Sequence, residues 1–145
     1  MIEGYKFDYG GTIDTAGCHW GIKIWHTYQQ LKLPITEQQY RKAYVYAEQT
    51  LGKTPIIQPN FTFRRTLEEK IKLQFQYLQR QGIIAETGFA FAKNYTNIVE
   101  KLYADTAETT QQSKKELLKL RNKYPLVLVS NFYGNISVVL QEFNL

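Results

Sequence analysis

Near its N-terminus the chain carries a short apolar and aromatic run that ends in a carboxylate, followed by two glycines. Residues 5–15 read YKFDYGGTIDT. A run of this kind bounded by glycine predicts a buried strand that leaves its sheet into a tight loop. Open α/β sheets bind ligands at the carboxyl ends of their strands, and glycines let a backbone approach a bound group closely. The pattern therefore predicts Asp8 at a strand tip, beside a loop whose N–H groups can form an anion-binding nest.

A second apolar run, LVLV at residues 126–129, follows Pro125 and ends in Ser130. Four consecutive apolar residues predict a strand that is buried on both faces. Between the two runs apolar residues recur at helical spacing, which predicts helices over residues 22–31, 36–51, 66–81, 89–104 and 113–123, with a last helix over 136–143. This order predicts a parallel α/β core that is interrupted by a helical domain.

The residues around Asp8 resemble the first motif of the haloacid dehalogenase (HAD) superfamily of hydrolases, an apolar strand followed by Asp-x-Asp-Gly-Thr-Leu/Ile. Residues 126–132 resemble the second motif of that family, an apolar strand that ends in Ser or Thr. The resemblance implies an α/β fold, with a parallel-sheet, Rossmann-like HAD core and an α-helical cap inserted after the first strand. It divides the chain into core residues 1–15, a cap over 16–104 and core residues 105–145. No counterpart of the third and fourth motifs follows Ser130, so the core is expected to be incomplete.

By this resemblance Asp8 is the nucleophile, which attacks a phosphoryl group or a carbon bearing a halogen and forms a covalent aspartyl intermediate. The resemblance also implies Mg²⁺ held by Asp8 and the Gly10 carbonyl, whereas a dehalogenase-type reaction would need no metal. Contacts with the phosphate or substrate are expected from Tyr9, Gly10, Gly11, Thr12, His19, Trp20, Ser130 and Asn131. For Ser130 and Asn131 the residues alone equally allow a helix N-cap, a role that Ser and Asn commonly fill.

Position 10 departs from the family pattern. Most family phosphatases carry an aspartate there that serves as general acid and base, whereas Gly10 has no side chain. Such catalysis typically contributes about 10²–10⁴-fold, so a different reaction, a slow phosphatase and no catalysis all stay open. The expected function is hydrolysis of a small phosphorylated or halogenated metabolite. The alternative is a non-catalytic fragment or anion-binding module that keeps the fold.

Composition and charge limit which binding partners and which cellular compartment are expected. The chain has 145 residues and a net charge of +5, a mild imbalance that suits a small anionic substrate, a nucleic acid or simply solubility. Its basic residues at 114–123 lack interleaved aromatic residues, so no nucleic-acid partner is expected. A single cysteine excludes a disulfide framework, and no secretory signal or apolar run of about 20 residues is present, so the expectation is a cytoplasmic protein without a membrane partner.

Two strands make a thin sheet, since three or more strands or good packing against helices are normally needed for independent stability. A homo-oligomer or a missing core segment is therefore expected to cover the sheet.

Overall fold

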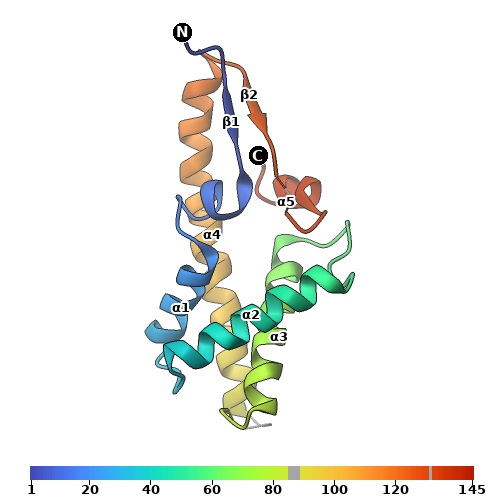
Figure 1. The fold of residues 1–145 in the computed structure, drawn as a ribbon. Helices are drawn as coiled ribbons and strands as arrows, with labels where there is room; N and C mark the ends of the chain where they lie inside the picture. Colours follow the sequence, from blue (N-terminus) through green and yellow to red (C-terminus); the bar gives the residue numbers. More distant parts are fainter. Residues whose placement is uncertain (85–88, 131) are drawn as a thin grey trace.

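The computed structural model describes residues 1–84, 89–130 and 132–145. The strands lie at one end of the molecule, helices pack at the other end, and a long helix runs beside both (Figure 1). In chain order the elements are β1 (Tyr5–Phe7), the turn η1 (Tyr9–Ile13), α1 (Trp20–Gln30), α2 (Glu37–Lys53), α3 (Phe63–Arg80), α4 (Phe89–Arg121), β2 (Leu126–Leu128) and α5 (Ile136–Glu142).

The predicted fold class, a Rossmann-like α/β core, is wrong. Helices cover most of the described chain, and its sheet consists of two parallel strands in which Tyr5 lies opposite Leu126 and Phe7 opposite Leu128. Within the described residues only the two apolar runs form strands, each three residues long, because the residues between them have helical periodicity and fold mostly as helices. In an α/β core, helices pack on both faces of a mostly parallel sheet, and a sheet of two short strands is too small for this arrangement.

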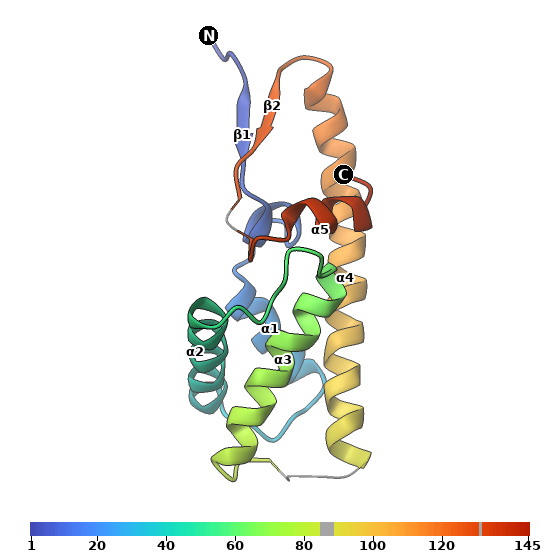
Figure 2. The ribbon, with the colours of Figure 1, turned by 90° about the vertical axis from the view of Figure 1, so that its right-hand side faces the viewer.

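One face of the sheet is open, which contradicts the prediction that the second strand is buried on both faces. Helix α4 covers the face that carries Phe7 and Leu128, and Leu117 packs there with them. On the opposite face Lys6 pairs with Val127, whose exposed fraction is 51%. The strands alternate in burial because helices cover only one side of them (Figure 2).

Helix α4 is continuous through residues 105–112, where the sequence predicted a break. This polar stretch stays helical because it turns one side toward the core, where Thr106 and Thr110 are fully buried. Farther along, the hydroxyl of Ser113 donates to the carbonyl oxygen of Ile13 at 2.7 Å and ties α4 to the turn after β1. The predicted boundary between cap and core at residue 104 therefore falls inside one helix.

Helices α2 and α3 form the largest contact of the helical end, and their starts follow from capping. A capping box starts α2: the Thr36 hydroxyl accepts from the backbone N–H of Gln39, and the Gln39 side chain accepts from that of Thr36. Helix α2 runs to Lys53, slightly beyond its predicted end at residue 51. Helix α3 begins before the predicted start at residue 66, because the Thr62 hydroxyl caps it. No helix of the described residues is both long and apolar enough to span a membrane.

Candidate functional site

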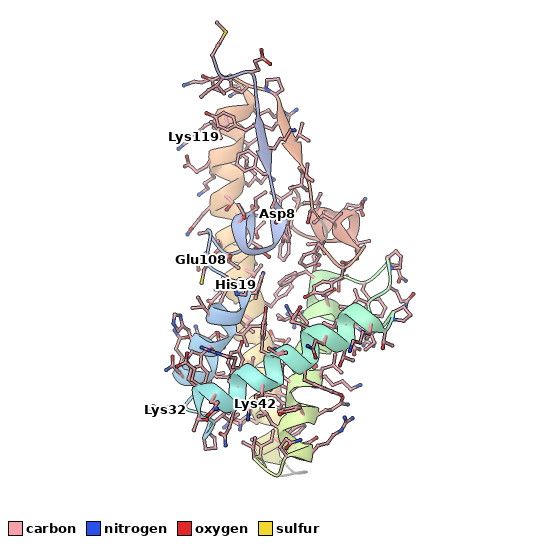
Figure 3. All side chains as sticks on the ribbon, viewed as in Figure 1. Asp8, His19, Lys32, Lys42, Glu108 and Lys119 are labelled. Carbon is pink, nitrogen blue, oxygen red and sulfur yellow. The ribbon has the colours of Figure 1, made fainter. Side chains whose placement is uncertain are left out.

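A cavity of about 270 Å³ lies where the strand ends meet the α2–α3 pair. The loops after β1 and β2 form one wall, and side chains of α2 and α3 form the opposite wall. Figure 3 shows Asp8 at the end of β1 and His19 where the chain passes into α1. The residues that line the cavity are Asp8, Gly10, Gly11, His19, Trp20, Tyr44, Glu48, Phe63, Thr66, Leu67, Lys70, Ser130, Phe132 and Tyr133.

Most of the side chains expected to contact substrate line this cavity, and two do not. Tyr9 is completely buried and packs its ring edge-on against Phe132, with 5.4 Å between the ring centroids. Thr12 lines a separate groove between the η1 turn and α4. Asn131 lies outside the described residues. Asp8, Gly10, Gly11, His19, Trp20 and Ser130 are brought together as expected.

The loop after β1 uses part of its hydrogen-bonding capacity internally. The backbone N–H of Tyr9 donates to Oδ1 of Asp8 at 2.7 Å, and the N–H of Gly11 donates to Oδ1 of Asp14 at 2.8 Å. Gly11 has a φ of 77°, a conformation that favours glycine. Since these two N–H groups already have carboxylate acceptors, the anion nest predicted for this loop is closed at both positions. A bound anion would need donors from elsewhere in the cavity.

Ser130 provides such a donor at the end of β2. Its Oγ accepts from the backbone N–H of Phe132 at 3.1 Å, which leaves the hydroxyl proton for an acceptor in the cavity. The next helix, α5, begins at Ile136 and has Asn135 as its N-cap residue. The interpretation of Ser130 as a helix N-cap is therefore wrong, because it stabilises a local turn instead.

A buried ion pair on the helical wall was not identified from the sequence. Lys70 of α3 is only 6% exposed, and its Nζ lies 3.0 Å from Oε1 of Glu48 on α2. The ammonium also lies 5.6, 5.9 and 5.5 Å from the ring centroids of Trp20, Tyr44 and Tyr133. Cations over aromatic faces are stabilised by the ring quadrupole. One signal in the sequence could have found Lys70: it falls in the apolar stripe of α3, between Leu67 and Ile71.

The surroundings of Lys70 keep it protonated. Burial alone lowers the pKa of its ammonium, but Tyr133, the Glu48 carboxylate and Tyr44 together outweigh burial and raise that pKa above its usual value. Burial likewise raises the pKa of Tyr133 to about 12, although the nearby ammonium pulls it down. At neutral pH the wall therefore presents the Lys70 cation, paired with the Glu48 carboxylate, and a neutral phenol.

Asp14 does not line the cavity but holds two residues that do. Its Oδ2 accepts from the indole N–H of Trp20 at 2.8 Å, while its Oδ1 holds the N–H of Gly11. Asp14 is completely buried, and this burial raises the pKa of its carboxyl to about 6, although both hydrogen bonds lower it. These contacts give Asp14 a structural role, in which it holds Gly11 and Trp20 by hydrogen bonds.

The stability of the fold should depend on pH through Asp14. Its pKa is higher in the folded chain than in an unfolded one, so it favours folding fully below about pH 4 and loses that effect as the pH rises through about 6. The loss amounts to at most about 3 kcal/mol. Asp14→Asn removes this titration, so its free energy of unfolding should fall less than that of the wild type between about pH 4 and about pH 7. Urea unfolding at both pH values measures the two slopes, and equal slopes would contradict the assignment.

At the end of β1 the cavity offers Mg²⁺ one carboxylate and one backbone carbonyl as ligands. Asp8 and Gly10 both line it, and Asp8 uses Oδ1 for the Tyr9 N–H. The described residues hold no group of three or more His, Cys, Asp or Glu side chains that could bind a metal ion by themselves. Mg²⁺ usually binds through one or two carboxylates together with waters and substrate phosphates, so a single carboxylate and a carbonyl fit that mode.

Comparison with protein-family models found no match, and comparisons with curated proteins and with solved structures found none either. What the chain does must therefore be inferred from the chemistry of the cavity.

Proposed function

We propose that the chain hydrolyses a small phosphorylated metabolite, with Asp8 as nucleophile, in the manner of the HAD-like hydrolases that its motifs resemble. One observation carries the proposal. Asp8 and Ser130, which end two strands far apart in the sequence, line a single cavity together with the buried cation of Lys70. A carboxylate, a hydroxyl donor and a positive charge are the groups needed to attack a phosphoryl group and hold its oxygens.

The first step transfers the phosphoryl group to the protein. A carboxylate oxygen of Asp8 attacks phosphorus, a bond from phosphorus to Asp8 forms, and the bond to the leaving oxygen breaks. The Ser130 hydroxyl donates to a phosphoryl oxygen, and the positive charge of Lys70 favours the anion in the cavity. Asp8 and the Gly10 carbonyl would hold Mg²⁺, which when bound neutralises charge on the phosphoryl oxygens.

Gly10 restricts the substrates that this site can use. Because it has no side chain, it cannot give a proton to the leaving oxygen. The site therefore suits leaving groups that depart readily as anions, as in aryl, acyl or enol phosphates, better than simple alkyl phosphates.

The direct test compares two substrates with the purified chain. We expect release of phosphate and nitrophenolate from 4-nitrophenyl phosphate in the presence of Mg²⁺, and no chloride from 2-chloropropionate. Chloride release would instead assign a dehalogenase. The second candidate, an anion-binding module without turnover, is favoured by Gly10 and by the internally bonded N–H groups of Tyr9 and Gly11. Binding of inorganic phosphate with no turnover of either substrate would support it.

Restoring a carboxylate at position 10 should broaden the substrate range. Gly10 has φ −64° and ψ 123°, which other residues adopt freely, and an added Cβ would meet only the Phe132 ring at 3.5 Å. We expect Gly10→Asp to raise kcat/KM for an alkyl phosphate such as glycerol phosphate by about 10²-fold, since a general acid typically contributes that much or more. Gly10→Asn, which has the same shape but no proton to give, is the control. Equal rates for both variants would contradict a missing general acid.

A further inference from the structure

The hydrolytic half of the reaction needs a proton acceptor that the motifs do not supply. Once Asp8 carries the phosphoryl group, a water must attack phosphorus, and it attacks faster if a base removes its proton. In most phosphatases of the HAD superfamily, whose first motif this loop resembles, an aspartate at the corresponding position does this, but here the residue is Gly10. The base must then come from another group that lines the cavity.

Two kinds of cavity side chain cannot be the base, because they are protonated at neutral pH. Lys70 stays protonated, because its neighbours raise the pKa of the ammonium despite burial. Tyr44 and Tyr133 stay neutral phenols, because burial raises the pKa of both hydroxyls. Among the described residues that line the cavity, the remaining side chains able to accept a proton are Asp8, His19 and Glu48.

Two of these three cannot be the base: Asp8 is used by the first half-reaction, and His19 is excluded by its hydrogen bond. Asp8 is itself phosphorylated at this stage under the proposed function. The Nδ1 atom of His19 accepts from the backbone N–H of Gly21 at 3.0 Å, where it caps α1. A neutral imidazole with Nδ1 as acceptor has its proton on Nε2, so that second nitrogen is a donor and not a base. Glu48 remains.

Glu48 is held at the cavity wall from both sides. Its Oε2 accepts from the Tyr133 hydroxyl at 2.8 Å, and its Oε1 lies 3.0 Å from Nζ of Lys70. Tyr133 comes three residues after Ser130 in the same loop, so this hydrogen bond fixes α2 against the loop that ends β2. The Glu48 side chain is 29% exposed, which gives it a route to return a proton to solvent.

We propose that Glu48 is the general base of the hydrolytic step, taking the place of the side chain that Gly10 lacks. This inference rests on the proposed function, since it requires a phosphorylated Asp8. The water oxygen forms a bond to phosphorus while Glu48 takes the proton of the water. The bond between phosphorus and the Asp8 oxygen breaks, inorganic phosphate leaves, and Asp8 is restored as a carboxylate. Glu48 then releases the proton to solvent.

The test separates the two half-reactions in a Glu48→Gln variant. With 4-nitrophenyl phosphate, nitrophenolate release reports the first step, and phosphate release reports the second. We expect the variant to release about one equivalent of nitrophenolate rapidly, to turn over about 10²-fold more slowly than wild type, and to accumulate phosphorylated protein. Glu37→Gln, an exposed glutamate on the same helix and outside the cavity, should leave turnover unchanged.

Each outcome has a definite reading. Unchanged turnover in Glu48→Gln, or slower turnover without accumulated phosphorylated protein, overturns the role of Glu48 and leaves Asp8 as nucleophile. If the wild type releases phosphate but Asp8 is phosphorylated neither in the wild type nor in Glu48→Gln, the proposed function itself is overturned. Should the unpaired Lys70 unfold the single variant, the Glu48→Gln/Lys70→Met double variant is measured in its place and is compared with Lys70→Met, because removal of Lys70 by itself weakens the first step. More phosphorylated protein in the double variant than in Lys70→Met supports the proposal, and equal amounts overturn it.

Discussion

Replacing Asp8 by asparagine should lower kcat for 4-nitrophenyl phosphate by at least about 10³-fold, because the amide cannot act as the nucleophile. The fold should not change. Asparagine keeps an oxygen that can accept from the backbone N–H of Tyr9, the one side-chain hydrogen bond that Asp8 makes in the described contacts. Steady-state kinetics measures the loss, and thermal unfolding of both proteins checks that stability is preserved.

A matched control separates this effect from a general change of charge. Asp105 on α4 forms ion pairs with Lys23 and Lys101 and lies outside the cavity. Asp105→Asn makes the same chemical change at a surface position, where ion pairs contribute little, and should keep full activity. An Asp8→Asn protein that turns over like wild type would remove Asp8 from the mechanism.

Removing the buried cation should cause the largest loss of stability. Lys70→Met keeps the length of the side chain but leaves the Glu48 carboxylate without its partner. Breaking a buried pair in this way costs about 3–5 kcal/mol, and we expect about 3 kcal/mol because Glu48 keeps some contact with water. Urea unfolding measures the difference in the free energy of unfolding.

Two comparisons make this result specific. Lys72→Met is the matched control, since Lys72 is an exposed lysine on the same helix, and its loss should be within about 0.5 kcal/mol of zero. The Lys70→Met/Glu48→Gln double variant should recover part of the lost stability, because no uncompensated charge remains. A single variant as stable as wild type would mean that the pair contributes nothing to the fold.

The sequence predicted the local elements of the site better than the architecture around it. Strand tips at Asp8 and Ser130 follow from apolar runs that end in polar residues, and the two tips do meet at one cavity. The fold class failed because short apolar runs do not reveal how many strands will pair. The predicted break in α4 was wrong because a polar stretch can remain helical when Thr106 and Thr110 turn toward the core.

The helical wall of the cavity could not be derived in the same way. Glu48 and Lys70 lie on different helices, and their pairing depends on how α2 packs against α3. Helical periodicity shows that Lys70 falls on the apolar face of α3, but it does not show which carboxylate balances the charge. The same holds for the hydrogen bond between Tyr133 and Glu48, which joins residues 85 positions apart.

Asp8 should become phosphorylated during turnover. The most direct measurement is the mass of the peptide that contains Asp8, after wild-type protein is mixed with 4-nitrophenyl phosphate and Mg²⁺, quenched in acid and digested. The account predicts one added phosphoryl group on that peptide, located at Asp8 by fragmentation and removed by hydroxylamine. Phosphate release during which neither the wild type nor Glu48→Gln carries this modification, or a phosphoryl group found on Ser130 instead, would contradict it.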